Sequence, residues 1–127
     1  MFVLFPDFRY LCHKCFEMTT DLEELRARIV QFTQERDWDQ FHDGKNLAIA
    51  LELEASELLE LYLWKDAGEV DVDKVREELA DVFNYAILIA DKYGLDVKQI
   101  VLDKLERNAR KYPVEKARGT AKKYNEL

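Results

Sequence analysis

Hydrophobic residues recur along this chain at the spacing of an amphipathic helix, and no stretch alternates in the manner of a β-strand. The capping box Thr20-Asp21-Leu22-Glu23 predicts a first helix that runs to about residue 37. Three further helices are predicted at residues 46–65, from Asp71 or Asp73 to Gly94, and from Asp96 to Pro113. The chain is therefore predicted to be all-α, with four helices.

Glycines and a proline set the limits of these helices. Residues 38–46 are typical of a loop with Gly44 at a turn, and Gly68 marks the exit from the second helix. Gly94 is expected to adopt a left-handed conformation at the end of the third helix, and Pro113 stops the fourth.

The second predicted helix is apolar on nearly every side. One face holds Leu47, Leu51, Ala55, Leu58 and Tyr62, and much of the rest is covered by Ile49, Leu53, Leu59 and Leu63. A helix of this kind is buried on several sides, which a four-helix chain of this size cannot achieve alone. We therefore expect other copies of the chain to pair with it into a helical bundle, as a homo-oligomer.

Composition and charge narrow the functional classes. A chain of 127 residues suits one domain, and its scarce Gly and Pro favour long helices. The net charge of −7 argues against a nucleic-acid binder. Residues 104–123 hold eight of the 19 Lys and Arg but two of the 26 Asp and Glu, a net of +6 that leaves −13 on the rest. An acidic body with a basic segment suits a metal and a phosphate at separate places, although a solvated helix and tail explain the charges equally well.

The N-terminal residues look like an extension. No stretch approaches the ~20 apolar residues of a membrane span, and the start carries Pro6, Asp7 and Arg9 without a signal-peptide pattern. A cytoplasmic protein that inserts in no membrane is therefore expected. We divide the chain into an extension (1–18), the helical domain (19–113) and a basic C-terminal arm (114–127).

Two cysteines lie in that extension. Cys12 and Cys15 form a C-x-x-C pair, which can bind zinc or exchange disulfides. A structural zinc site needs a second ligand pair, and His42 is the only other histidine outside this cluster. Metal or redox chemistry is therefore disfavoured here, and removal of residues 1–17 is expected to leave activity unchanged.

Candidate chemistry lies on the second and third helices. At 100° per residue, Glu54 and Glu57 fall about 60° and 120° to one side of Leu51. Glu78 and Asp81 fall about 40° and 100° to the same side of Val82. If the two helices pack antiparallel, the four carboxylates can face each other.

Four close carboxylates repel one another, and a divalent cation relieves that repulsion. Their hard oxygen atoms suit Mg²⁺ or Mn²⁺. The coordination sphere of Mg²⁺ usually includes substrate phosphates as well. Surface glutamates paired with lysines are the plain alternative for either motif taken singly. A di-iron bundle is disfavoured because such sites use Glu-x-x-His, and neither motif here contains a histidine.

These motifs resemble those of the MazG-like family of all-α nucleoside triphosphate pyrophosphohydrolases, and within it the dCTP pyrophosphatases. The family pattern is E-x-x-E followed some twenty residues later by E-x-x-D, which here is Glu54-Ala55-Ser56-Glu57 and Glu78-Leu79-Ala80-Asp81. The flanking stretches 36–47, 57–64, 77–85, 104–113 and the final residues are similar as well. The resemblance covers about residues 21–127.

The resemblance implies a function and a set of site residues. A helical bundle, commonly a tetramer, would hydrolyse a dNTP to dNMP and pyrophosphate, as house-cleaning of the nucleotide pool. Glu54, Glu57, Glu78 and Asp81 would be catalytic and would hold Mg²⁺. The nucleotide would meet Trp38, His42 and Trp64 at its base, Tyr85 at its sugar, and Lys104, Asn108 and Lys111 at its phosphates.

Several alternatives remain open at this point. Many family members have Glu-Glu at the first motif, where this chain has Leu53-Glu54, so the general base is one of the four ligands or Glu77. The substrate is expected to be dCTP or a modified dCTP, with dUTP or another non-standard dNTP as the alternative. A catalytically silent helical interaction module is a third reading, which the complete set of four carboxylates disfavours.

Overall fold

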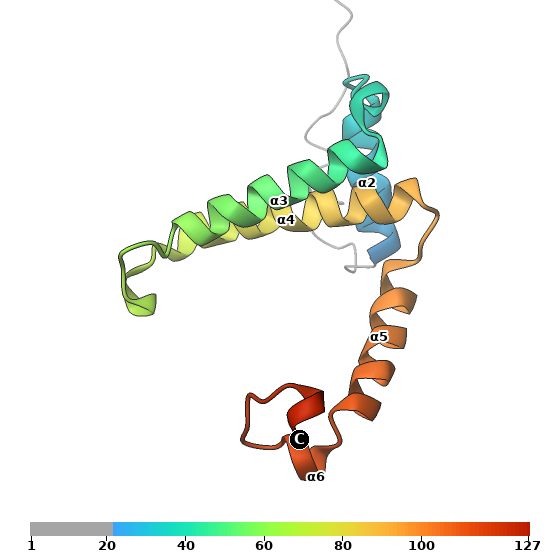
Figure 1. Ribbon diagram of the computed structural model, residues 1–127. Helices are drawn as coiled ribbons and strands as arrows, with labels where there is room; N and C mark the ends of the chain where they lie inside the picture. The colour runs from blue at the N-terminus through green and yellow to red at the C-terminus, as the bar shows by residue number, and fades with distance from the viewer. Residues whose placement is uncertain (1–21) are drawn as a thin grey trace, which may run out of the picture.

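The computed structural model describes residues 22–127, and Figure 1 shows that they form helices joined by short turns. The helices are α2 (Leu22–Gln34), α3 (Gly44–Glu60), α4 (Val72–Lys92), α5 (Val97–Lys111) and the short α6 (Val114–Ala117). Single 3-10 turns lie at η1 (Asp39–Phe41), η2 (Ala67–Glu69) and η3 (Tyr124–Glu126). No strand occurs in this range, which confirms the all-α prediction. The predicted capping box at 20–23 begins outside the described residues, and the cysteine pair lies wholly outside them.

The body of the molecule is an antiparallel pair of helices. α3 and α4 lie side by side along their length, and α2 packs across α4 (Figure 1). Leu47 near the start of α3 is buried, as are Ile87, Leu88 and Ala90 in the C-terminal part of α4. This antiparallel arrangement is the one that the two carboxylate motifs require if they are to face each other.

Local capping explains where the helices begin. Asp43, Asp71 and Asp96 precede α3, α4 and α5, and each accepts a hydrogen bond from a backbone N–H of the first turn. Such a bond satisfies a donor that the helix itself leaves unpaired. Asp71, rather than Asp73, is therefore the cap of α4. Gly94 follows α4 with a φ of +63°, as its position predicts.

Three predicted limits are wrong, the first being the end of α2, which lies at Gln34 instead of about residue 37. Because Asp43 caps α3, this helix begins at Gly44, which lies inside the helix rather than at a loop turn. The lack of a side chain matters there, since a Cβ would lie 2.0 Å from Tyr93 Oη. α3 also ends at Glu60 instead of residue 65. Trp64, with a φ of +61°, adopts the left-handed conformation there, and Gly68 lies within η2.

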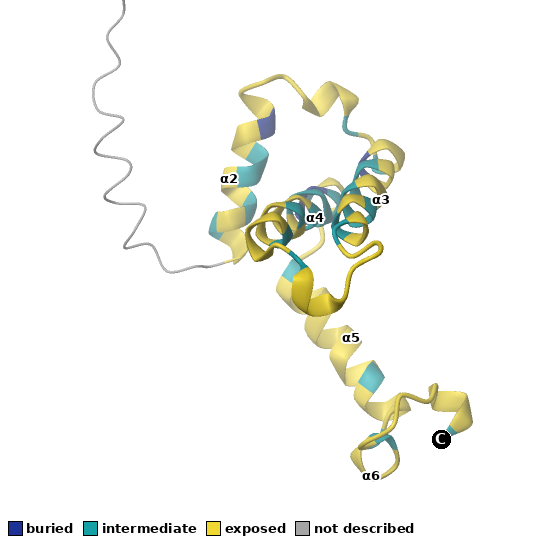
Figure 2. Cartoon of the chain, turned by 90° about the vertical axis from the view of Figure 1, so that its left-hand side faces the viewer, coloured by how far each residue is buried: buried dark blue, intermediate teal, exposed yellow. Residues whose placement is uncertain are grey.

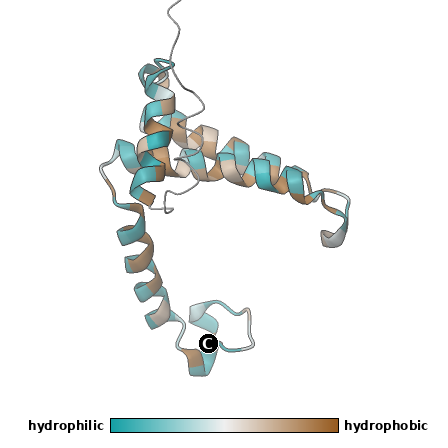
Figure 3. Cartoon of the chain, turned by 180° about the vertical axis from the view of Figure 1, so that it is seen from behind, coloured by the Kyte–Doolittle hydropathy of each residue, from teal (hydrophilic) through white to brown (hydrophobic). Residues whose placement is uncertain are grey.

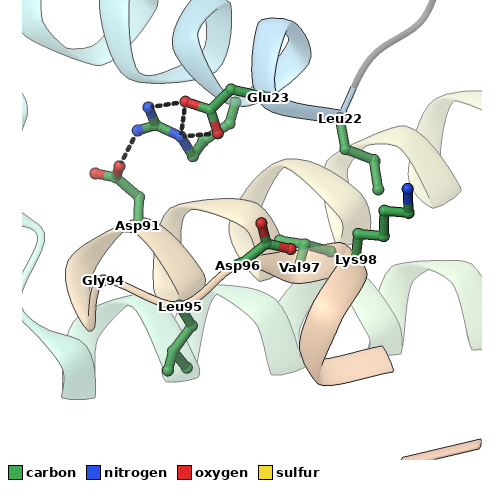
Figure 4. A pocket seen from close by; sticks show the side chains of 9 residues that line it. Leu22, Glu23, Asp91, Gly94, Leu95, Asp96, Val97 and Lys98 are labelled. Carbon is green, nitrogen blue, oxygen red and sulfur yellow. Dashed lines mark hydrogen bonds and ion pairs between the residues drawn. The ribbon is translucent and has the colours of Figure 1, made fainter. Parts of the chain in front are cut away.

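An ion pair joins α2 to the end of α4, close to where α5 begins. Arg26 of α2 pairs with Asp91 near the end of α4 and with Glu23 on its own helix (Figure 4). These ion pairs line a hollow of about 520 Å³, whose opposite wall is the turn from Gly94 into α5. α5 then runs away from the other helices (Figure 1).

Much apolar surface remains exposed in the single chain. Figure 2 shows that α5 is exposed over most of its length, and Figure 3 shows hydrophobic residues along it and along α3 and α4. Leu53 and Leu59 of α3 and Leu105 of α5 are all more than half exposed. The expected oligomer would cover such residues, and it stays a prediction. Within the described range, no helix is both long and apolar enough to cross a membrane.

Candidate active site

Carboxylates from α3 and α4 meet at one place on the antiparallel pair. Glu54 projects from α3, while Glu78 and Asp81 project from neighbouring turns of α4. One carboxylate oxygen from each of the three lies within 4.8 Å of the others. Oxygen ligands at this spacing can hold one divalent cation of the magnesium type, and the set contains no soft ligand.

Glu57 joins this cluster from the next turn of α3. Its carboxylate is close enough to raise the pKa of both Glu54 and Glu78. All four carboxylates predicted to face each other are therefore neighbours in the folded chain.

Partial burial and the negative charges of the cluster raise the pKa values of two of its carboxyl groups. Partial burial raises the pKa of Glu54, and the charges of Glu57, Asp81 and Glu78 raise it further. Partial burial also raises the pKa of Glu78, together with its hydrogen bond and charge repulsion from Glu57. Both carboxyl groups thus hold a proton more readily than free glutamate does. A bound cation would reverse this preference, since it favours the ionised form.

An aromatic cavity of about 320 Å³ opens beside the cluster, between α2, α4 and the loop that precedes α3. Its wall includes Trp38, His42, Asp81 and Tyr85. Asp81 belongs to both the cluster and the cavity. A ligand seated in this cavity would therefore extend directly toward the carboxylates.

Two aromatic side chains that line this cavity pack against each other. The rings of Phe32 and Trp38 meet edge to face, with centroids 5.8 Å apart. The guanidinium of Arg36 lies 3.6 Å from the Phe32 centroid. Such contacts fix the plane of an indole more firmly than an isolated exposed ring would be fixed.

Two polar side chains of the cavity stand out, one for its raised pKa and one for a nitrogen without a hydrogen-bond partner in the described residues. Burial raises the pKa of Tyr85, and the charges of Glu54 and Asp81 raise it further. The Tyr85 phenol therefore stays protonated and can donate a hydrogen bond. The Nδ1 atom of His42 is buried and has no hydrogen-bond partner among the residues described. A ligand in the cavity could supply that partner.

A second hollow, of about 420 Å³, lies on the opposite side of the cluster. Glu57 and Glu78 form part of its wall, together with Lys65 and Lys74. The carboxylates thus stand between an aromatic cavity and a strongly charged hollow.

Four of the residues predicted to contact the nucleotide lie apart from the cluster in the single chain. Trp64 is 99% exposed, in the turn after α3. Lys104, Asn108 and Lys111 lie on α5, which runs away from the body. The amino group of Lys111 lies 5.0 Å from the Tyr124 ring centroid. One chain therefore brings together Trp38, His42 and Tyr85 with the carboxylates, but not these four residues.

The cavity also contains residues that sequence reasoning missed. They are Arg28, Ile29, Phe32, Thr33, Asn84 and Leu88. The side chain of Thr33 is buried, with its hydroxyl 2.8 Å from Val30 O and 3.0 Å from Asp39 Oδ1. A usable signal existed for Asn84, because it is a polar residue three positions after Asp81 in an otherwise apolar stretch.

Comparison with known proteins places this arrangement in a group. Residues 49–127 match the MazG-like family. The chain is 38% identical over 120 residues to dCTP pyrophosphatase 1 of Homo sapiens and of Bos taurus, a match that spans 88% of this chain and 71% of each relative. It also resembles the crystal structure of a pyrophosphatase from Archaeoglobus fulgidus, with a TM-score of 0.70 and 34% identity over 76% of this chain and 96% of that one.

Proposed function

This chain belongs to the MazG-like family and is a nucleoside triphosphate pyrophosphohydrolase, and we propose that its substrate is dCTP or a modified dCTP. The observation that carries the proposal is the meeting of Glu54, Glu78 and Asp81 beside an aromatic cavity. The reaction would add water across the bond between the α- and β-phosphates, giving dCMP and pyrophosphate. The role would be house-cleaning of the nucleotide pool in the cytoplasm.

We propose that Glu54, Glu57, Glu78 and Asp81 hold Mg²⁺, with Mn²⁺ able to replace it. The donor set fits, since all four are hard oxygen ligands that repel one another when ionised. When bound, such an ion supplies Lewis-acid activation and neutralises charge on the phosphates. One of these carboxylates, or Glu77, would accept the proton of the attacking water.

The cavity beside the cluster would hold the nucleoside. Its indole at Trp38 offers a stacking surface, and His42 offers a buried nitrogen for the edge of the base. Tyr85, one turn after Asp81, would lie near the sugar. Stacking accepts every base, so discrimination has to come from hydrogen bonds at the ring edge.

The remaining contacts would come from other copies of the chain. Trp64 does not line the aromatic cavity and is 99% exposed. α5 lies apart from the body of the chain. We propose a homo-oligomer, with a tetramer preferred over a dimer, in which Lys104, Asn108 and Lys111 of α5 reach the phosphates of a neighbouring site.

The test is pyrophosphate release from dCTP, dUTP, dTTP, dATP and dGTP, with Mg²⁺ and with EDTA. We expect dCTP to have the highest kcat/KM and EDTA to abolish turnover. A tenfold preference for a purine dNTP or for dUTP would overturn the base assignment and leave the chemistry standing. Absence of pyrophosphate from all five substrates would favour a silent helical module instead.

A further inference from the structure

A single amide stands where the carboxylate cluster meets the aromatic cavity. Asn84 lies on α4 one turn after Asp81, half-buried, and its side chain lines the cavity. Next along the helix, Ile87 and Leu88 are buried. A polar side chain placed partly out of water loses free energy unless it is hydrogen-bonded, so an amide in this wall calls for a partner.

The amide has one partner that fixes its orientation. Asn84 Nδ2 donates to Asp81 Oδ1 over 3.2 Å, and this is its only hydrogen bond within residues 22–127. An ionised carboxylate can only accept, so the NH₂ side of the amide must face Asp81. The carbonyl oxygen is left free to accept a hydrogen bond from a ligand with a hydroxyl or amino donor.

The position of the amide selects which donor that is. Asp81 belongs to the group proposed to hold the metal and phosphates, whereas Trp38 and His42 belong to the part proposed to hold the base. The sugar connects these two parts of a nucleotide. We propose that Asn84 is a specificity-determining residue that accepts a hydrogen bond from the sugar 3′-hydroxyl. This inference rests on the proposed function, because it takes the ligand of the cavity to be a deoxynucleotide.

The experiment combines a substitution in the protein with the removal of one hydroxyl from the substrate. Asn84→Leu keeps the approximate size of the side chain but removes the acceptor, and 2′,3′-dideoxy-CTP lacks the 3′-hydroxyl. For the wild-type protein we expect kcat/KM for dCTP to exceed that for dideoxy-CTP by about 3- to 10-fold, the range of one net hydrogen bond. For Asn84→Leu the ratio should fall to about 1, because neither substrate can make the bond.

The ratio separates this role from a merely structural one. Loss of the bond to Asp81 would lower turnover of both substrates equally and leave the ratio unchanged, which would overturn the proposal. A wild-type protein indifferent to the 3′-hydroxyl would overturn it as well. Gln31→Leu is the matched control, since it removes an exposed amide that donates to Glu35 over 2.7 Å, and its ratio should equal that of the wild type.

Binding of the product gives a second readout that needs no turnover. Calorimetry should show that the wild-type protein binds dCMP more tightly than 2′,3′-dideoxy-CMP, and that Asn84→Leu binds both equally. If Asn84→Leu fails to give the wild-type circular dichroism spectrum, Asn84→Ala takes its place. Failure of the proposed substrate would be visible separately, as poor turnover of dCTP by the wild-type protein, and the same cycle would then use the preferred dNTP and its dideoxy form.

Discussion

At the scale of single residues, the site depends on carboxylates whose repulsion the fold does not relieve. Glu54 and Glu78 both have raised pKa values, with causes that include the neighbouring acidic side chains. A protein that needed these residues only for packing would gain by replacing them with uncharged ones. Retaining the charges is consistent with a cation as their intended partner.

Removing one ligand charge should stop the reaction without unfolding the chain. We expect Glu57→Gln or Asp81→Asn to lower kcat by at least about 100-fold, since each change keeps the shape and removes a charged oxygen ligand. Glu52→Gln on the exposed side of α3 is the control and should retain wild-type turnover. Wild-type rates for either ligand variant at saturating Mg²⁺ would refute the metal assignment.

The same repulsion makes a prediction about stability and pH. Because the pKa of Glu78 is raised in the folded chain, protonation of this side chain stabilises the fold. The contribution is fully present below pH 4.5, the ordinary pKa of the group, and is lost as pH rises through the raised pKa. In EDTA at pH 7, Glu78→Gln should therefore have a higher Tm than the wild type. The difference should shrink as pH falls toward 4.5, where the wild-type side chain is itself protonated.

Scanning calorimetry at several pH values measures this effect. Added Mg²⁺ should raise the Tm of the wild type more than that of Glu78→Gln, because only the wild type keeps all four ligands. A metal-free wild type more stable than the variant at pH 7 would show that repulsion is not the dominant effect.

At the scale of elements, the turn between α4 and α5 directs the C-terminal quarter of the chain. Gly94 has a φ of +63°, and the Asp96 side chain accepts from Gln99 N to begin α5. The ion pair between Arg26 and Asp91 ties α2 to the same corner. Together these contacts fix where α5 departs, although little else of α5 touches the body.

Substitution of this glycine should be costly for a backbone reason alone. Gly94→Ala forces an L-residue into the left-handed region, which costs about 1–2 kcal/mol. No atom lies within 4 Å of the added Cβ, so strain and not collision is the cause. Gly68→Ala is the matched control, because it also has open space but no positive φ, and it should change stability little. Urea unfolding of both variants measures the difference in stability. Equal midpoints would contradict the prediction that backbone strain destabilises Gly94→Ala.

Sequence reasoning succeeded where structure is local. The caps at Asp71 and Asp96, the left-handed Gly94 and the two i, i+3 carboxylate pairs follow from helical geometry. The end of α3 at Glu60 could not be predicted, because neither a glycine nor a proline marks it and the next residues, Leu61 to Leu63, are as apolar as the helix itself. Asn84 was missed although it is a polar residue in an apolar stretch, because its place beside the cavity depends on the packing of α2 against α4.

At the scale of the whole molecule, one chain has too little core for its apolar content. Within the described range, the buried hydrophobic residues are Leu47, Ile87, Leu88 and Ala90. Larger side chains on α3, α4 and α5 remain exposed, among them Leu59 at 62% and Phe83 at 57%. Exposed apolar surface on this scale is typical of a subunit.

We therefore expect light scattering to find a stable homo-oligomer at micromolar concentration, with a mass nearer four chains than two. Leu59→Glu should weaken the assembly, because it places a charge on the apolar face of α3. Arg76→Ala, at an exposed position of α4 paired with Asp73, should leave the mass unchanged. A monomeric wild-type protein would refute this expectation and would leave the phosphate contacts from α5 without a source.

The near-complete exposure of Trp64 has a spectroscopic consequence. The chain holds two indoles, Trp38 in the aromatic cavity and Trp64 in the turn after α3. Fully hydrated indoles emit at long wavelength, so burial of Trp64 by a neighbouring copy should shift its emission to the blue as protein concentration rises. The variant Trp64→Phe should lose this shift and retain only the emission of Trp38, whose quenching by dCMP would then follow occupancy of the cavity. In an unlabelled protein, the blue shift measured without ligand would thus report assembly, and the quenching of Trp38 in Trp64→Phe would report occupancy of the cavity.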